Sequence, residues 1–236
     1  IDNACAEGTA YIRSGQTSER RLRCAIENRI VAATEAVAYA AHLLTQAHNP
    51  SVFGLDRSTC ETQAVGLELA RGLKGTIDDN SSIHYGGLIQ EIESGAIPTG
   101  SLSEAKDADL ILYWGSNPYH SHPRHLSQYT YYCREQYSAA GWVPSVALTC
   151  VEVRDTETSF LCSPVFKVEP GGDKSFIGEI LHTISGTGLT ERASAFIRLL
   201  RKHKFAMIFV GLGLNYALDN NFAPFCEMVT ALSKEL

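Results

Sequence analysis

Apolar runs of strand length alternate along this chain with segments whose apolar residues recur at helical spacing. The apolar runs predict buried strands at residues 110–114, 146–153, 165–168 and 205–210, and shorter strands at 52–55 and 76–78. Helical spacing predicts helices at residues 27–47, 58–73, 126–139, 174–185, 191–202 and 223–236. Strands that alternate with helices form parallel βαβ units, so we expect an α/β fold with doubly wound, mostly parallel sheets.

Turn and cap residues set the limits of several elements. Asn49-Pro50 ends the first predicted helix, Ser58 or Thr59 caps the second, and Gly75 stops it. Residues 86–100 open on two glycines and are expected to have mixed structure. We expect an N-terminal α/β lobe at residues 1–100, with part of the sheet shared, and a Rossmann-like lobe at 101–236.

The most informative stretch covers residues 109–125, where an apolar strand stops at a turn and leads into a histidine-rich loop. The turn consists of Gly115, Ser116, Asn117 and Pro118. The loop contributes His120, His122, Arg124 and His125. Open parallel sheets bind ligands at the carboxyl ends of their strands, so we expect a ligand site here. A solvated loop that is merely rich in histidine is the alternative.

Four turns follow the predicted strands and are expected to gather at one edge of the sheet, at residues 78–87, 115–125, 152–158 and 211–215. Glu152 and Arg154 are two residues apart and can point the same way, the acid toward a ribose or guanine edge and the arginine toward a phosphate. Gly211 and Gly213 allow close backbone approach, although such turns often reflect only tight packing. Together the turns favour a nucleotide-like ligand.

The histidines could in principle ligate a metal, but no acidic partner lies near them in sequence. We therefore expect His120, His122 and His125 to form hydrogen bonds or an interface, and Arg124 to meet an anion. His84 is a lone histidine of the kind that is usually structural. Cys60 begins a helix, and we expect it to be packed rather than reactive.

Composition excludes several classes of protein. The chain has 236 residues, a net charge of −6 and no basic block, which argues against a nucleic-acid surface. No apolar run approaches the roughly 20 residues that cross a bilayer, and the start carries no signal-peptide pattern. Seven irregularly spaced cysteines indicate neither a disulfide scaffold nor a metal ribbon. We expect a cytoplasmic protein with free, mostly buried thiols.

The motifs GSNP-x-H-x-HPRH, VEVRDTET, VEPGGD and FVGLGL resemble, in this order, one family. They are similar to the B subunits of formylmethanofuran dehydrogenase and of the formyltransferase/hydrolase complex, in the molybdopterin oxidoreductase superfamily. The resemblance covers residues 3–235 and is most specific at 109–173. It implies a molybdopterin-oxidoreductase-type fold with a dinucleotide-pterin lobe. It also implies that a pterin guanine dinucleotide site, or its relic, is formed by Gly115, Ser116, Asn117, Pro118, Glu152, Arg154, Thr156, Gly211 and Gly213.

The chain departs from the redox members of this family at the cofactor. They carry an N-terminal cysteine cluster for a [4Fe-4S] centre, where this chain has only Cys5. Their metal-binding thiolate corresponds here to His84, followed by Tyr85, and imidazole is a poor substitute for thiolate on such a metal. Glu152 stands where the family has aspartate. The C-terminal domain that closes over the second pterin is also expected to be missing, so we expect no cofactor on this chain.

The resemblance implies a non-redox, scaffolding B subunit without confident catalytic residues of its own. The complex would transfer formyl from formyl-tetrahydromethanopterin to a methanofuran-type carrier and hydrolyse it to formate. Its A, C and D subunits would be the partners, with the carrier and zinc bound to partner subunits, and no nucleic acid or membrane. One alternative is a catalytic subunit with a tungsten or molybdenum pterin guanine dinucleotide, its metal held by His84 or by a cysteine thiolate at another position. The other is a stand-alone module that binds a guanine nucleotide.

Overall fold

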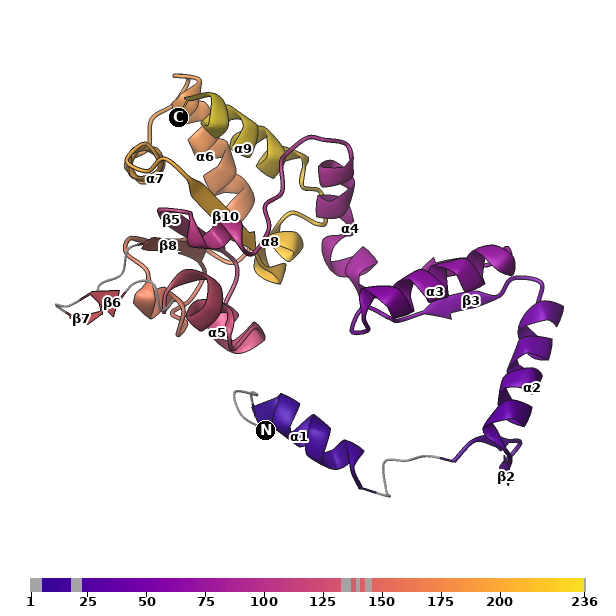
Figure 1. The fold of residues 1–236 in the computed structure, drawn as a ribbon. Helices are drawn as coiled ribbons and strands as arrows, with labels where there is room; N and C mark the ends of the chain where they lie inside the picture. The colour runs from indigo at the N-terminus through magenta and orange to yellow at the C-terminus, as the bar shows by residue number, and fades with distance from the viewer. Residues whose placement is uncertain (1–5, 18–22, 133–136, 139–140, 143–145, 236) are drawn as a thin grey trace. The chain divides into compact units, whose positions relative to one another are not determined.

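A computed structural model describes residues 6–17, 23–132, 137–138, 141–142 and 146–235. The chain divides into two compact units, Ile1–Ser82 and Ile83–Leu236, and each is described by itself. The expected lobes at 1–100 and 101–236 stay a prediction. Figure 1 shows the elements of both units.

The N-terminal unit is built around one βαβ segment. Its elements are α1 (Ala6–Gly15), β1 (Ala25–Ile26), β2 (Arg29–Ile30), α2 (Ala33–Gln46), β3 (Ser51–Phe53), α3 (Cys60–Gly72) and β4 (Thr76–Asp78). β3 and β4 pair in parallel, with Val52 opposite Ile77. The predicted cap of α3 is confirmed at Thr59, whose side chain accepts a hydrogen bond from the Thr62 backbone.

The helix expected from residue 27 is wrong over its first turns, because β1 and β2 form an antiparallel hairpin there. Glu27 and Asn28 join the two strands with φ of 48° and 68°. Two consecutive residues with positive φ match the tight turn that the twist of a hairpin favours. The apolar periodicity that predicted a helix therefore applies only from Ala33 onward.

The C-terminal unit contains a four-stranded parallel sheet. Its strands are β5 (Leu110–Trp114), β8 (Ala147–Glu152), β9 (Val165–Lys167) and β10 (Ala206–Val210), in the order β10-β5-β8-β9. Every neighbouring pair is parallel, and Leu112 lies opposite both Ile208 and Thr149. The expected α/β class with a parallel sheet is confirmed. A separate antiparallel pair joins β6 (Tyr137–Ser138) to β7 (Gly141–Trp142).

Every residue of β5 is buried, so both faces of this sheet are covered. The helices are α4 (Asn80–Glu93), α5 (Pro118–Ser121), α6 (Asp173–Ile184), α7 (Glu191–Leu200), α8 (Leu212–Ala217) and α9 (Ala223–Glu235). Leu110, Leu112 and Trp114 pack in one core with α6, α7 and α9, which lie over one face in Figure 1. Ile111 and Tyr113 point into a second core on the opposite face.

The segment at 86–100, expected to have mixed structure, continues α4 to Glu93 and is irregular after it. Gly87 packs closely in this helix, since a Cβ there would lie 1.9 Å from the carbonyl oxygen of Asn220. One other expectation for this unit is wrong. The helix expected at 126–139 is reduced to one π-helical turn, Leu126–Thr130. Tyr131 and Tyr132, which follow this turn, have lower helix propensity than Ala or Leu. Residues 133–136 and 139 lie outside the described residues.

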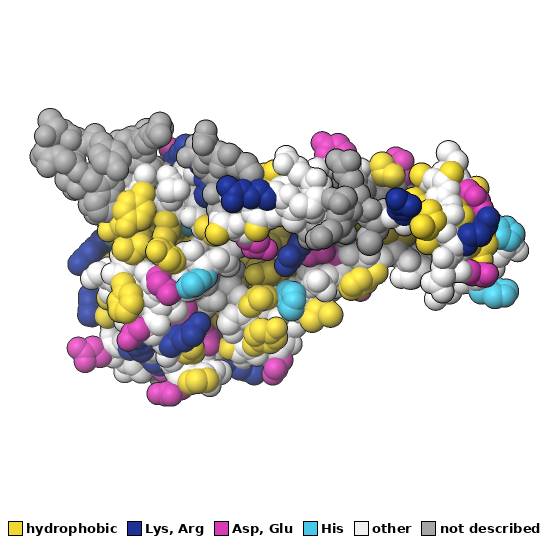
Figure 2. Space-filling model, turned by 90° about the horizontal axis from the view of Figure 1, so that it is seen from below, with side chains coloured by type: hydrophobic (Ala, Val, Ile, Leu, Met, Phe, Trp, Pro, Cys, Tyr) yellow, Lys and Arg dark blue, Asp and Glu magenta, His cyan; other side chains and the backbone are white. Residues whose placement is uncertain are grey.

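Two expectations concern partners, namely that the chain binds neither nucleic acid nor a membrane. On the face drawn in Figure 2, the described Lys and Arg side chains are scattered among acidic and apolar ones and form no continuous basic surface. Among the described residues, no helix is both long enough and apolar enough to cross a membrane. Of the described cysteines, Cys150, Cys162 and Cys226 are buried, whereas Cys24 and Cys60 are exposed.

Candidate functional site

Three of the four expected turns meet at the carboxyl edge of the parallel sheet. They follow β5, β8 and β10, and the segment after β9 leads from the same edge into α6. The fourth turn, at residues 78–87, follows β4, which is exposed and belongs to the other sheet. That turn was wrongly placed because a short apolar pattern does not reveal which sheet a strand joins.

The glycines of these turns are required by packing. Gly115 has a φ of 57°, and a Cβ on it would lie 2.8 Å from the Leu214 backbone nitrogen. A Cβ on Gly211 would lie 2.0 Å from the Gly115 carbonyl oxygen, and one on Gly213 would lie 3.2 Å from the Gly115 Cα. The turns after β5 and β10 therefore touch each other through their backbones. This contact explains the glycines without any ligand.

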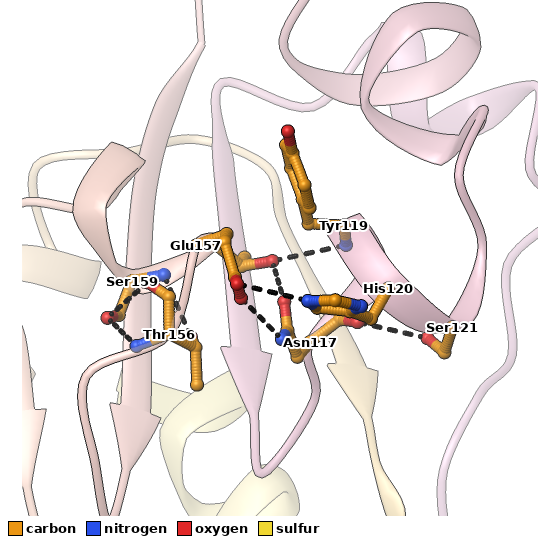
Figure 3. Close-up of polar contacts among 8 residues, drawn as sticks. Asn117, Tyr119, His120, Ser121, Thr156, Glu157 and Ser159 are labelled. Atoms are coloured by element: carbon orange, nitrogen blue, oxygen red, sulfur yellow. Dashed lines mark hydrogen bonds and ion pairs between the residues drawn. The ribbon is translucent and has the colours of Figure 1, made fainter.

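Side chains join the turn after β5 to the turn after β8, as Figure 3 shows. The Thr158 hydroxyl donates to Asn117 Oδ1 at 2.6 Å and accepts from the Tyr119 backbone N–H at 3.3 Å. Asn117 Nδ2 donates to Glu157 Oε2 at 3.2 Å, and His120 Nε2 lies 3.0 Å from Glu157 Oε1. We call Asn117, His120, Glu157 and Thr158 the loop clamp. It uses both polar atoms of the Asn117 side chain.

Glu157 carries the negative charge of the loop clamp, and its contacts favour the ionised carboxylate. Its own backbone N–H, His120 and Asn117 all hydrogen-bond the carboxylate and lower the pKa of Glu157 to about 2. The His120 and Glu157 side chains are 68% and 48% exposed, so solvent screens their ion pair and its net contribution to stability is small. Orientation of the two turns is the main effect of the clamp.

The remaining predicted residues of the 152–158 turn have local roles. Thr156 is buried and exchanges hydrogen bonds with Ser159, at 2.8 Å and 3.1 Å between backbone nitrogens and hydroxyls. Glu152 Oε1 accepts from the Val153 backbone, and Arg154 is exposed. Ser116 and Pro118 continue the turn after β5, where Pro118 is buried as the first residue of α5.

A cavity of about 260 Å³ lies at the same edge, between the turns. Its lining includes Gly115, Val153, Gly171, Asp173, Gly213 and Tyr216. Asp173 is 4% exposed, and its Oδ1 accepts from Trp114 Nε1 at 2.7 Å. Burial raises the pKa of this carboxyl, and the Trp114 hydrogen bond opposes that effect. Sequence reasoning missed Asp173 and Tyr216, although the VEPGGD motif ends on Asp173.

The histidine-rich loop separates into different environments. His122 is exposed, and its Nδ1 lies 2.9 Å from the Ser121 hydroxyl. Arg124 is exposed as well. His125 is buried, its Nε2 lies 3.2 Å from the Tyr113 hydroxyl, and burial lowers the pKa of His125 to about 4. Across the described residues, no three His, Cys, Asp or Glu side chains gather as a metal site.

His84 lies in the middle of α4, half-buried. Its Nδ1 is buried and has no hydrogen-bond partner among the described residues, as is also true of Asn215 Oδ1. The amide nitrogen of Asn215 approaches the Ile83 carbonyl at 3.5 Å. Within the described part of the chain, His84 is therefore a single imidazole without other metal-ligating side chains grouped around it.

Comparison with curated proteins identifies the relatives of this chain. It is 32% identical over 152 residues to the B subunit of the tungsten-containing formylmethanofuran dehydrogenase 2 of Methanocaldococcus jannaschii, covering 64% of this chain and 35% of the relative. The chain is a homologue of the formylmethanofuran dehydrogenase B subunit. The protein of the same name from Methanococcus maripaludis is 28% identical over 184 residues, covering 74% of this chain and 42% of the relative. No family model matches.

A solved structure shares the fold of this homologue of the formylmethanofuran dehydrogenase B subunit. It is a chain in the formyltransferase/hydrolase complex FhcABCD of Methylorubrum extorquens, crystallised with methylofuran. The TM-score is 0.65 at 16% identity, and the match covers 86% of this chain and 55% of that chain. The homologue thus spans less than half the length of its curated relatives and about half of the solved chain.

Proposed function

We propose that this chain is a B-type subunit of a complex that moves a formyl group. The complex transfers formyl from formyl-tetrahydromethanopterin to a methanofuran-type carrier and then hydrolyses it to formate. The A, C and D subunits are the partners, and the A subunit carries zinc for the hydrolysis. In this proposal the chain is a non-redox scaffold. The fold shared with a chain of the formyltransferase/hydrolase complex supports this assignment.

One observation carries the non-redox part of the proposal. This chain is a homologue of a tungsten-containing subunit, yet it has His84 at the position that the resemblance assigns to the metal-binding thiolate. Dithiolene-bound tungsten and molybdenum favour soft thiolate ligands, and imidazole is a harder ligand. The Nδ1 atom of His84 is buried in the packing of α4, and no further ligand side chains gather near it in the described part of the chain.

The turns that would hold a pterin guanine dinucleotide also form contacts with each other. Both polar atoms of Asn117 are used in the loop clamp, and Gly115 and Gly211 touch each other. These contacts, together with an imidazole at residue 84 in place of a thiolate ligand, do not fit a metal-bearing pterin. We therefore assign the carboxyl edge a structural role, in which the loop clamp keeps two turns of the scaffold in a fixed arrangement.

Deletion of this chain in its native host tests the scaffold role. We expect the remaining subunits to lose their assembly, together with both formyl transfer and formyl hydrolysis. Re-expression with His84→Ala should restore both activities, because this proposal gives His84 no part in the chemistry. Full assembly and both activities without the chain would refute the proposal.

The second candidate function is catalytic, and the names of the curated relatives favour it. In that case the chain is the tungsten or molybdenum subunit of a formylmethanofuran dehydrogenase, with the metal held by His84. His84→Ala would then abolish dehydrogenase activity. The same variant thus separates the two functions, since the scaffold tolerates it and the redox enzyme does not.

A further inference from the structure

The cavity at the carboxyl edge has a lining that is partly acidic and otherwise mostly apolar. Asp173 and Glu152 are the charged side chains of this lining, and no Lys, Arg or His of the described chain takes part in it. The apolar part comes from Val151, Val153, Pro170 and Ala217. We call this space, which Tyr216 also lines, the edge cavity. It presents two carboxyl groups beside apolar walls, with no basic side chain of its own.

The two carboxyl groups of the edge cavity are held by neutral donors. Trp114 Nε1 donates to Asp173 Oδ1, and the Val153 backbone N–H donates to Glu152 Oε1. Neither carboxyl group forms an ion pair with another described residue. Asp173 is 4% exposed, and burial raises the pKa of its carboxyl group because an ionised carboxylate without a paired cation is costly to bury. A cation in the cavity would offset that cost.

The start of α6 lies at the same place, and a helix dipole by itself favours an anion there. Asp173 is the first residue of α6 and already supplies that anion. A nucleotide would bring its phosphates close to the carboxyl groups of Asp173 and Glu152, where the described lining offers no Lys or Arg to pair with them. The electrostatics of the cavity therefore favour a positively charged occupant over a nucleotide.

Tyr216 gives the edge cavity an aromatic wall. Its side chain belongs to α8, lines the cavity and is still 64% exposed. The face of a tyrosine ring attracts a guanidinium or ammonium group. The cavity volume of about 260 Å³ is below the roughly 300–1,000 Å³ of pockets that enclose drug-sized ligands. The space therefore suits one long cationic side chain better than a dinucleotide.

We propose that the edge cavity receives the side chain of an arginine from a partner subunit. This inference rests on the proposed function, in which the chain works within a complex. The guanidinium group pairs with Asp173 and Glu152 and lies against Tyr216, while the aliphatic stem contacts the apolar walls. Arginine suits the cavity better than lysine, because a guanidinium group is more weakly hydrated and has five donors for two carboxyl groups. An arginine buried in a pocket is also a common anchor of protein interfaces.

The edge cavity is formed before any partner binds. Its walls come from the turns after β5, β8 and β10, and a Cβ on Gly211 would lie 2.0 Å from the Gly115 carbonyl oxygen. The loop clamp joins the turns after β5 and β8 through Asn117 and Thr158. An arginine can therefore enter without first ordering these turns, which lowers the cost of association.

Arginine footprinting of the native complex tests this inference. Phenylglyoxal modifies accessible guanidinium groups, and mass spectrometry reads each arginine of the partner subunits. We expect Glu152→Gln and Tyr216→Ala each to increase the modification rate of one and the same partner arginine by at least about tenfold. Asp173 is left unchanged because it also bonds Trp114. Glu169→Gln is the matched control, since it removes an exposed carboxylate close in sequence to Pro170 but outside the lining, and it should leave the rate unchanged.

A photo-crosslinking amino acid in place of Tyr216 gives a second measurement, which does not depend on whether the other variants assemble. We expect the crosslink to join the partner peptide that contains the same arginine. A complex that assembles and is active, but in which the variants expose no partner arginine, would overturn the inference and leave the scaffold role standing. The deletion experiment tests the scaffold role separately.

Other occupants of the edge cavity would give distinct results. A crosslink to a peptide without arginine, or to a second copy of this chain, would overturn the inference. A nucleotide released when the wild-type complex is denatured, and absent from the Tyr216→Ala complex, would overturn it as well. An equal increase of the modification rate in Glu169→Gln would show that only the general charge of this edge matters, and this too would contradict a specific arginine site.

Discussion

The indole nitrogen of Trp114 donates a hydrogen bond of 2.7 Å to the carboxylate of Asp173, and both side chains are buried. Trp114 is the last residue of β5, and Asp173 is the first residue of α6. The bond therefore ties the end of the central strand to the start of a core helix. A carboxylate in the first turn of a helix is also favoured by the helix dipole.

Removal of the Asp173 carboxylate should destabilise this unit. Asp173→Ala leaves the Trp114 N–H buried without an acceptor, which costs on the order of 1–3 kcal/mol. Asp173→Asn keeps an acceptor oxygen and should lose less. Urea unfolding of the two variants and the wild type measures the difference. Equal stability of Asp173→Ala and the wild type would show that the hydrogen bond contributes nothing.

Gly211→Ala should be strongly destabilising, because the added Cβ would lie 2.0 Å from the backbone oxygen of Gly115. The turns after β5 and β10 must then separate, with an overpacking cost of about 1–3 kcal/mol. Gly178→Ala is the matched control, since this glycine lies inside α6 and a Cβ there meets open space. Alanine at 178 should raise stability by about 0.5–1 kcal/mol. Thermal unfolding compares the two, and a tolerated alanine at 211 contradicts the packing role.

Disruption of the loop clamp should loosen α5 without unfolding the sheet. Asn117→Ala removes both the contact to Thr158 and the contact to Glu157, so amide exchange at Tyr119 should accelerate. Glu157→Gln retains an acceptor for Asn117 and should have a weaker effect. The pKa of Glu157 is lowered to about 2, so its contribution is complete above its ordinary value near 4.5 and is lost as the pH falls through 2.

Exchange measured across this pH range checks the clamp directly. The wild type should show faster exchange at Tyr119 only below about pH 4 once intrinsic rates are subtracted. Unchanged exchange in Asn117→Ala at neutral pH would mean that the backbone alone holds the two turns together.

His125 should make stability fall in mildly acidic solution. Burial lowers the pKa of His125 from 6.5 to about 4. Between pH 6.5 and pH 4 the unfolded chain therefore binds a proton at this residue that the folded chain does not bind. The contribution is complete above pH 6.5 and declines as the pH falls toward 4, by on the order of 3 kcal/mol. His125→Phe removes this titration, although it also removes the contact with the Tyr113 hydroxyl. Urea unfolding at pH 7.5 and 5 should show a smaller pH effect in the variant, and an equal effect excludes His125 as its source.

The strands of the parallel sheet were predictable because their apolar runs are long and bounded by turn residues. Leu110–Trp114 was predicted to the residue, and β8, β9 and β10 within one residue at each end. α4 was missed because a helix that contains Gly86 and Gly87 looks like a turn until Asn220, distant in sequence, is seen against it. Such a contact between distant residues leaves no local pattern.

The position of the candidate site could be predicted from the sequence, but the contacts between its side chains could not. The rule that ligand sites follow parallel strands located the turns at Gly115 and Glu152. It did not reveal that Asn117 and Thr158 would bind each other, or that Asp173 would turn toward Trp114. These pairings depend on the distance between turns on neighbouring strands, which sequence spacing does not contain.

The central claim is that this homologue of a tungsten-containing subunit is a non-redox scaffold. Elemental analysis for tungsten, molybdenum, iron and zinc, with pterin extraction, tests it most directly on the complex purified from its native host. We predict zinc in the complex, and no pterin, tungsten or molybdenum in stoichiometric amount on this chain. Stoichiometric tungsten or molybdenum with a pterin guanine dinucleotide bound to this chain would contradict the claim and make His84 the first residue to test as a ligand.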